Sequence, residues 1–193
     1  MIFLVRHGQT AFNAEGRIQG AKDSPLTEFG VRQGERLGVL LGGLAPRDVR
    51  IVASPRGRTQ HTARLIRAHG AFGAEIETDD RLAEISLGDW DGMLKDDIRA
   101  LSPDYDAGDR RWSWFFDAPG ADSYEAMTER LGGWLEDARA AGGPMIAVSH
   151  GVAGRILRGL FLRMPRSEAL MLDIPQDACF RMHGGTIERI DCP

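Results

Sequence analysis

The chain is poor in cysteine, with only Cys179 and Cys192 among its 193 residues. The two form no Cys-x-x-Cys pair, and no set of cysteines and histidines has zinc-finger spacing. A structural zinc site is therefore not expected. A disulfide between them stays open as an alternative, but a chain of this length can bury a sizeable core without staples. We expect reduced thiols.

Long hydrophobic runs and an excess of positive charge are also missing. The first apolar run, residues 2–5, is far too short for a signal peptide, and no later run is long enough to cross a bilayer. The formal net charge is −4, which gives no basis for binding nucleic acid or an anionic membrane surface. We expect a cytoplasmic protein whose partner is a small molecule.

Strand and helix patterns alternate along the chain. Short apolar runs predict strands at 2–5, 50–53, 75–78 and 145–149, and helices are expected at 28–41, 55–68, 93–101, 123–141 and 152–162. Three more strands, at 170–174, 179–183 and 186–190, are expected to close the sheet. The alternation predicts an α/β fold, a three-layer α/β/α sandwich with a mainly parallel central sheet and antiparallel strands at its C-terminal end.

Residues able to bind and attack a phosphoryl group follow three of the parallel strands. The junctions read Arg-His-Gly at 6–8, Ser-Pro-Arg-Gly-Arg at 54–58 and Ser-His-Gly at 149–151. Parallel strands place these carboxyl ends on one edge of the sheet, where ligands bind. The guanidinium fork matches phosphate oxygens, and a neutral imidazole can attack phosphorus. The sequence therefore predicts a phosphate cage with His7 as its nucleophile.

Five motifs in a fixed order carry a family resemblance. They are Leu-Val-Arg-His-Gly-Gln-Thr at 4–10, Pro-Leu-Thr at 25–27, Ser-Pro with Arg58, Leu-Ala-Glu-Ile at 82–85 followed by Gly-Asp-Trp-Asp-Gly at 88–92, and Ser-His-Gly at 149–151. Together they cover almost the whole chain, which resembles the histidine phosphatase superfamily, the phosphoglycerate mutase-like proteins. The resemblance implies one domain over residues 1–193, with residues 86–122 as a cap or insertion over the site.

The resemblance also implies a catalytic role for each motif residue. His7 would attack phosphorus and form a phosphohistidine, while Arg6, Arg58 and His150 would hold the phosphoryl oxygens and offset their charge. His150 is expected to do so in its protonated form. Glu84 would donate a proton to the leaving alkoxide and then activate water, and we expect it to be shielded from water in the complex.

Further phosphate or substrate contacts are expected from Asn13, Gln19, Gly151, Arg17 and Thr10. Arg56 departs from the apolar residue usual at its place in the family and is expected to face solvent, with a contribution to the phosphate cage as the alternative. No cofactor and no metal ligands are expected, because a metal-dependent hydrolase needs clustered aspartates that this chain does not show.

The aromatic residues at 112–116 are expected to pack in the core or to form the face of a homodimer. A lid over the site is the alternative, because this segment lies within the expected cap.

The reaction is predicted from how open the site is. The chain stops at Pro193, three residues after the last expected strand, so no tail is expected to cover the site. An uncovered phosphohistidine is hydrolysed. We therefore expect a metal-independent phosphatase that acts on a small phosphorylated metabolite. A cofactor-dependent phosphoglycerate mutase is the alternative. A non-catalytic phosphate-binding protein is a more distant one, because the expected catalytic residues are all present.

Overall fold

The computed structural model describes residues 1–193, with the side chain of Asp109 excepted. Its centre is a six-stranded sheet in the order β3-β2-β4-β1-β5-β6. The strands are β1 (Ile2–Arg6), β2 (Arg50–Ala53), β3 (Ile76–Thr78), β4 (Met145–Ser149), β5 (Ala178–His183) and β6 (Thr186–Asp191). Strands β1 to β4 run parallel to one another, β5 pairs antiparallel with β1, and the edge strand β6 pairs antiparallel with β5.

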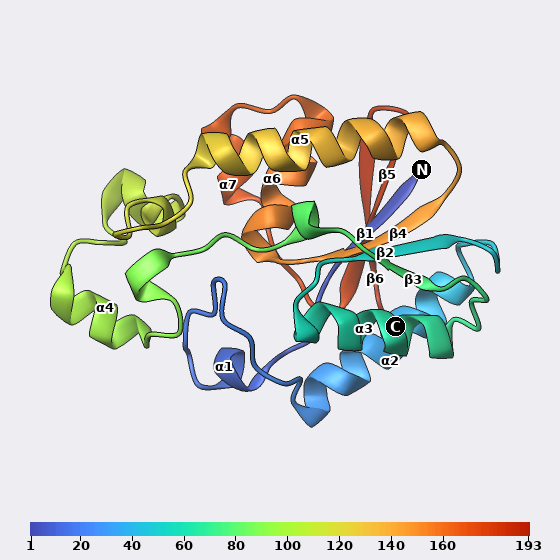
Figure 1. Ribbon diagram of the computed structural model, residues 1–193, viewed down its shortest axis with the longest axis horizontal. Helices are drawn as coiled ribbons and strands as arrows, with labels where there is room; N and C mark the ends of the chain where they lie inside the picture. The colour runs from blue at the N-terminus through green and yellow to red at the C-terminus, as the bar shows by residue number, and fades with distance from the viewer.

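Helices cover both faces of this sheet (Figure 1). They are α1 (Ala11–Ala14), α2 (Glu28–Gly42), α3 (Gly57–His69), α4 (Lys95–Leu101), α5 (Tyr124–Ala141), α6 (Gly151–Leu162) and α7 (Arg166–Met171). Helices α2 and α3 lie on one face, and α5, α6 and α7 lie on the other. Within the part of the chain that the structure describes, no helix combines the length and the apolar character needed to cross a membrane.

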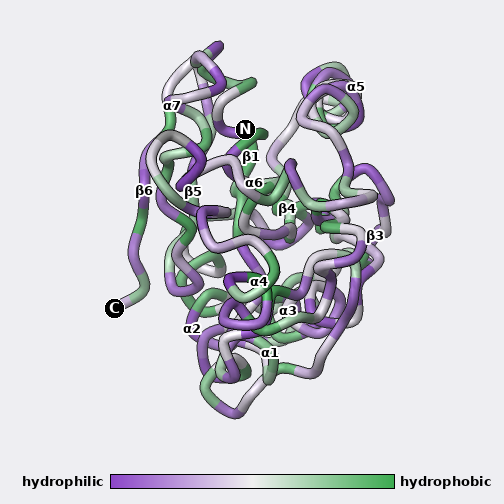
Figure 2. Tube along the Cα trace, turned by 90° about the vertical axis from the view of Figure 1, so that its left-hand side faces the viewer, coloured by the Kyte–Doolittle hydropathy of each residue, from purple (hydrophilic) through white to green (hydrophobic). Residues whose placement is uncertain are grey.

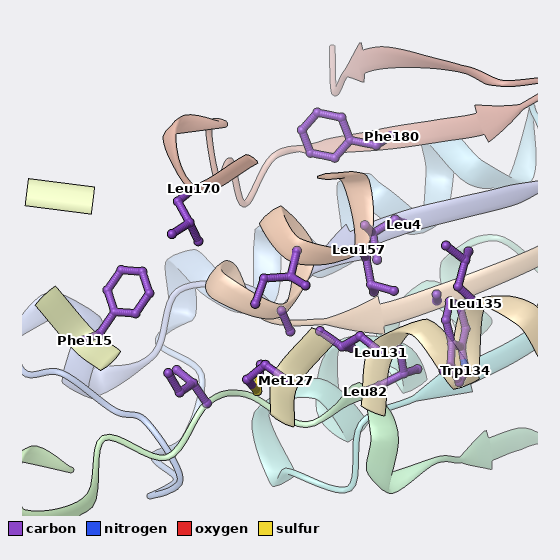
Figure 3. Packing of buried hydrophobic residues seen from close by; sticks show 14 of the residues in the cluster. Leu4, Leu82, Phe115, Met127, Leu131, Trp134, Leu135, Leu157, Leu170 and Phe180 are labelled. Atoms are coloured by element: carbon purple, nitrogen blue, oxygen red, sulfur yellow. The ribbon is translucent and has the colours of Figure 1, made fainter. Parts of the chain in front are cut away.

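The period-two alternation of strand side chains divides the core in two. In β1, Phe3 and Val5 join a buried cluster with Leu37 of α2 and other residues on that face. Leu4 faces the other way and packs with Leu157 of α6 (Figure 3). Because both faces of the central strands are buried, the strands read as continuous apolar runs, and their carboxyl ends are rigid supports for a site.

The segment between β3 and α5 shares the second of these cores. Trp90, Tyr105 and Phe115 belong to the same buried cluster as Leu4 and Met127. Phe115, Leu4 and Met127 are labelled in Figure 3. Figure 2 shows α4, from this segment, in front of the central strands and between the two helical layers. The segment therefore lies beyond the carboxyl ends of β1 and β4.

The α/β/α architecture predicted from the sequence is confirmed, but one expected strand is wrong. Residues 166–171 form α7, and residues 172–177 run on as an irregular segment. The apolar run at 169–172 suits a helix or a strand, and packing decides between them. Helix α7 begins after Pro165 and approaches α6 so closely that a Cβ on Gly159 would lie 2.4 Å from that of Ala169.

The loop after β1 and the two cysteines can also be compared with the expectations from the sequence. The long loop expected at 8–25 contains the short helix α1, which begins at Ala11 directly after its N-cap, Thr10. Cys179 is buried and Cys192 half-buried, and both thiols are free.

Candidate active site

His7 follows directly on β1, and the backbone holds it on both sides. Its N–H donates to the carbonyl of Ser149 at 3.1 Å, which extends the pairing of β1 with β4 by one residue. Gly8 then passes so close to α2 that a Cβ there would lie 2.3 Å from the carbonyl oxygen of Gly30. Only glycine permits this approach, so the Arg-His-Gly sequence determines where the imidazole lies.

The buried His7 imidazole is held in a single tautomer. Its Nδ1 lies 2.8 Å from the carbonyl oxygen of Gly8. Because a carbonyl only accepts, Nδ1 carries the proton and Nε2 keeps its lone pair. Burial, and then the charges of Arg6 and Arg58, hold the pKa of His7 well below its usual value. The ring is therefore neutral at pH 7, and its Nε2 can act as a nucleophile.

His150 follows β4 and lies beside His7, with the ring centroids 5.3 Å apart. Its Nε2 is 2.7 Å from the Ser54 hydroxyl, while Nδ1 is buried without a hydrogen-bond partner among the described residues. Burial, and then the charges of Arg58, His7 and Arg6, hold the pKa of His150 well below its usual value. The ring is thus neutral at pH 7. If the Ser54 hydroxyl donates to Nε2, Nδ1–H remains as a donor for a ligand.

Arg58, in the first turn of α3, is buried in a cradle of backbone carbonyls. Its Nη atoms donate to the carbonyl oxygens of Lys22 at 2.6 Å and Gly20 at 3.0 Å, and to the carboxylate of Asp23 at 3.0 Å. Burial lowers the pKa of Arg58, whereas Glu84 and Asp23 raise it. The loop at 20–23 therefore fixes the position of the Arg58 guanidinium and its positive charge.

Arg6, the last residue of β1, is held from the opposite side. Its Nη1 donates to the carbonyl of Ile174 at 2.8 Å, and its Nε is buried without a partner among the described residues. Burial lowers the pKa of Arg6 to about 10, against the opposing effect of Glu84. The guanidinium therefore stays charged at neutral pH, and its Nε is free to bind an anion.

The carboxylate of Glu84 lies at the N-terminus of α6. It accepts the N–H groups of Val152 at 3.2 Å and Ala153 at 3.0 Å. Free N–H groups and the helix dipole favour a negative charge at this position. Glu84 thus caps the helix that begins next to His150.

The loop that carries Glu84 is tied to the scaffold at several points. The Ser149 hydroxyl donates to the carbonyl of Leu82 at 2.8 Å, and Arg130 of α5 donates to the carbonyl of Ala83 at 2.9 Å. Leu82 itself is fully buried. The carboxylate is therefore positioned by β4 and α5 as well as by its own sequence.

Most of the predicted site residues line one cavity of about 530 Å³. They are Arg6, His7, Asn13, Arg17, Gln19, Arg58 and Glu84. Gly151 lies between two of them, since a Cβ on it would be 3.7 Å from both Arg6 Nε and Glu84 Oε2.

Thr10 does not take the place expected for a ligand. It is fully buried behind Asn13, where its hydroxyl accepts the N–H of Asn13 and its own N–H donates to Asn13 Oδ1, both at 3.2 Å. Thr10 is the N-cap of α1, and this reciprocal pair is a capping box. Its contribution to the site is to hold Asn13.

Arg56 also differs from its expected position. It is half-buried, its Nε is buried without a partner among the described residues, and its charge lowers the pKa of His150. The reason is that α3 begins at Gly57, two residues later than predicted. Arg56 is the extended residue before the helix, so its side chain is not on the outer face of the helix.

The outer part of the cavity was indicated in the sequence only by the lid alternative for residues 112–116. This part is lined by further cationic and aromatic side chains, namely Lys95, Arg99, Tyr105, Arg111, Trp112, Trp114, Phe115 and Arg155. Arg155 follows Gly151 by four residues on α6, and this one-turn spacing could have indicated it. Lys95 and Arg111 lie in the expected cap, where the order of the residues gives no sign of which side chains face inward.

The aromatic residues at 112–116 divide between core and cavity. Phe115 is 5% exposed within the main core and also borders the cavity, as do the half-buried Trp112 and Trp114. Above the Trp112 ring lie the guanidinium carbons of Arg111 at 5.0 Å and Arg155 at 5.6 Å. The segment therefore contributes to the core, as expected, and also to the lining of the cavity, while the lid and the homodimer face stay predictions.

A match to a protein family shows which family has this arrangement of paired histidines and arginines. The family described as histidine phosphatase superfamily (branch 1) matches residues 2–186. The chain belongs to the histidine phosphatase superfamily. The resemblance seen in the motifs is thereby confirmed, and the protein is an enzyme of a superfamily that contains phosphatases and mutases.

Histidine phosphatase relatives are found among both curated sequences and solved structures. A probable phosphoglycerate mutase, GpmB, of Yersinia pestis is 34% identical over 170 residues, which are 85% of this chain and 75% of that protein. A mycobacterial glucosyl-3-phosphoglycerate phosphatase, solved with VO3, is 26% identical with a TM-score of 0.80, covering 98% of this chain and 96% of that one. Bacillus stearothermophilus YhfR is 29% identical with a TM-score of 0.78, covering 98% and 95%.

Proposed function

We propose that the protein is a phosphatase that hydrolyses a small, anionic phosphate monoester through a phosphohistidine on His7, without a metal ion. One observation carries the proposal: the cavity that holds neutral His7 also holds the carboxylate of Glu84 and the guanidinium groups of Arg6 and Arg58. These groups supply a nucleophile, an acid–base group and fixed positive charge around one point.

In the first step, the Nε2 lone pair of His7 attacks phosphorus as the bond to the ester oxygen breaks. The Nδ1–H bond to the Gly8 carbonyl keeps the ring in the reactive tautomer and favours the positive charge that develops on it. The protonated form of Glu84 gives its proton to the leaving alkoxide. The products are the free alcohol, a phosphohistidine and the Glu84 carboxylate.

In the second step, water attacks the phosphohistidine. The Glu84 carboxylate takes one proton from the water as its oxygen bonds to phosphorus and the P–N bond breaks. Phosphate leaves, and His7 is again neutral. Lys95, Arg99 and Arg111 at the outer end of the cavity are exposed, which supports access of water to the intermediate.

Arginine takes the place of a metal ion in this scheme. The Nε atoms of Arg6 and Arg58 and the Nδ1 of His150 are buried and have no hydrogen-bond partner among the described residues. Burial of such groups costs free energy unless a ligand satisfies them, and a phosphoryl group has the oxygens to do so. Their charge can offset that of the transition state.

The lining of the outer cavity is consistent with a substrate that carries a second negative group. Arg155 is 9% exposed, lines the cavity, and lies with Arg111 against the ring of Trp112. Cationic side chains outnumber the carboxylates of Glu84 and Asp106 in the lining of this cavity, which favours a ligand with a carboxylate or a second phosphate. The flat Trp112 ring suits an apolar or planar part of the same molecule.

A phosphoglycerate mutase is the second candidate, because the Yersinia pestis relative carries that name. A mutase would return the phosphoryl group from His7 to the substrate instead of passing it to water. The two activities share the first step and differ only in the acceptor.

The deciding experiment measures phosphate release with EDTA present. The substrates are p-nitrophenyl phosphate and a panel of phosphorylated metabolites, including 3-phosphoglycerate with and without 2,3-bisphosphoglycerate. Release that is insensitive to EDTA and lost in His7→Ala is the expected result. Interconversion of phosphoglycerates without release would make the protein a mutase. Phosphate binding with neither reaction would make it a non-catalytic binding protein.

A further inference from the structure

Gln176 connects the nucleophile to the loop after β1. Its side-chain Nε2 lies 3.0 Å from the carbonyl oxygen of His7 and 3.2 Å from Asn13 Oδ1. Gln176 is half-buried in the irregular segment before β5, and Asn13 lies between it and the cavity. These two contacts join parts of the chain that are more than 160 residues apart in sequence.

The polarity of this network is determined at both ends. The carbonyl of His7 only accepts, so the Gln176 atom that faces it is the amide nitrogen. At the other end, the N–H of Thr10 only donates, and it lies 3.2 Å from Asn13 Oδ1. The oxygen of Asn13 therefore receives two N–H groups, and its Nδ2 is left for the cavity that Asn13 lines.

The segment that carries Gln176 is itself firmly held. The carbonyl of Ile174 accepts Nη1 of Arg6 at 2.8 Å. The carboxylate of Asp173 accepts Nη1 of Arg158 at 2.9 Å and also pairs with Arg189. Arg158 is 4% exposed on α6, so the arginine end of this ion pair is buried, whereas Asp173 is exposed. Gln176 is thus presented to Asn13 from a fixed backbone.

We infer that Gln176 is a positioning residue for phosphate recognition, which keeps the amide of Asn13 turned so that Nδ2 donates to the phosphoryl group. The inference rests on the proposed function, because it takes the cavity at His7 as the phosphate site. Without the Gln176 donor, only Thr10 opposes rotation of the Asn13 amide. A rotated amide places its oxygen against the phosphate oxygens, where it repels them.

The test is calorimetric titration of the 193-residue protein with inorganic phosphate. Gln176→Met keeps the length of the side chain and removes the donor. Its dissociation constant for phosphate is expected to rise about three- to tenfold, the effect of one hydrogen bond to a charged ligand. In an Asn13→Ala background, the same substitution is expected to change the constant less than about twofold.

Gln60→Met is the matched control. The Nε2 of Gln60 also donates to two acceptors, the carbonyl of Ser54 at 2.8 Å and the hydroxyl of Thr78 at 3.2 Å, but the residue lies outside the cavity. It should leave phosphate binding unchanged. Thermal unfolding checks that each variant folds. If Gln176→Met does not, Gln176→Glu replaces it, since an ionised carboxylate has the same size and no donor.

The outcomes separate this inference from the proposed function. A parent protein that does not bind phosphate contradicts the proposed function. A parent that binds phosphate while Gln176→Met binds equally well overturns the role of Gln176. So does a loss of the same size with and without Asn13, because the effect would then not pass through that side chain.

Discussion

His7 and His150 lie edge to face at the ends of two neighbouring parallel strands, with ring centroids 5.3 Å apart and ring planes at 63°. Both rings are buried, and the fixed charges of Arg6 and Arg58 act on both. Strand pairing of β1 with β4 sets their separation, because Arg6 and Ser149 are in register directly before them. The fold thus holds two neutral imidazoles in a positive environment until an anion arrives.

This pair is expected to make the free energy of unfolding depend on pH. In the unfolded chain both imidazoles titrate near pH 6.5, whereas the folded state holds both pKa values well below that. Below about pH 6.5 the unfolded chain therefore binds more protons, and stability falls as pH falls. The slope is about 1.4 kcal/mol per pH unit for each histidine.

Urea unfolding between pH 7.5 and 5.0 measures this dependence. His150→Asn should lower the slope, and His183→Asn, at an exposed position in β5, should keep it. Carboxylates contribute equally to the pH dependence of unfolding in all three proteins, so their contribution cancels when the slopes are compared. A parent whose stability is flat from pH 7 to 5.5 would show that the two rings are not held neutral.

Replacement of His7 is expected to remove turnover while the fold survives. His7→Asn keeps a polar side chain in the same space but has no nucleophilic ring nitrogen, so kcat on p-nitrophenyl phosphate should fall by at least about 10³-fold. Acid-labile phosphate on the protein, trapped during turnover, should disappear with it. Normal thermal unfolding of the variant together with normal activity would rule out His7 as the nucleophile.

The loss of kcat on replacing Glu84 is expected to increase with the basicity of the leaving group. Glu84→Gln removes the proton donor, so kcat for an alkyl phosphate should fall about 10²- to 10⁴-fold. The loss for p-nitrophenyl phosphate should be much smaller, because nitrophenolate leaves without a proton. Glu129→Gln, exposed on α5, is the control and should change neither rate. Equal losses on both substrates would exclude the proton-donor role.

The parts of this site that the sequence predicts are those next to a strand end. His7, Arg58 and His150 each lie within a few residues of a buried strand, and parallel topology alone brings such positions to one edge. Glu84 was indicated only by its place among ordered motifs, since its loop is held by Ser149 and Arg130 through contacts that no local pattern encodes.

The parts that could not be predicted depend on packing between distant segments. The apolar run before Gln176 fits a strand as well as a helix, and the contact of α7 with α6 makes it a helix. That choice turns residues 172–176 into the segment that contacts Arg6, His7 and Asn13. Arg56 was misplaced for a similar reason, because the first turn of α3 starts two residues later than Ser-Pro suggests.

Gly20 is expected to be essential for the cradle of Arg58. Its backbone has φ +51°, and a Cβ there would lie 1.6 Å from Asp91 Oδ1. That same oxygen accepts the N–H groups of Ala21 at 3.1 Å and Leu87 at 2.9 Å, so Asp91 ties the Arg58 cradle to the loop after Glu84. An added methyl group must push the two loops apart.

Gly20→Ala should therefore weaken phosphate binding and lower the free energy of unfolding by about 2 kcal/mol or more, from backbone strain plus steric overlap. Gly143→Ala is the matched control, because Gly143 also has a positive φ, +71°, a Cβ added there would meet nothing within 4 Å, and the residue lies outside the cavity. The control variant has only the free-energy cost of a positive φ, without the steric overlap. Equal effects of the two substitutions, by urea unfolding and phosphate titration, would mean that the Asp91 contact does not hold the cradle.

Arg155 is expected to select substrates that carry a second negative group. Arg155→Met removes the buried cation beside Trp112 and keeps most of the side-chain volume. For a phosphorylated carboxylic acid such as 3-phosphoglycerate, KM should rise about 10- to 100-fold, the range for losing a hydrogen bond between charged groups. For p-nitrophenyl phosphate, which has no second acid group, KM should change less than about threefold.

Arg139→Met is the control for this prediction. Arg139 also lies over an aromatic ring, that of Phe161 at 5.1 Å, but it is outside the cavity. If Arg155→Met raises KM equally for both substrates, the arginine acts on the transferred phosphoryl group or on the shape of the site, and the outer cavity does not read a second charge.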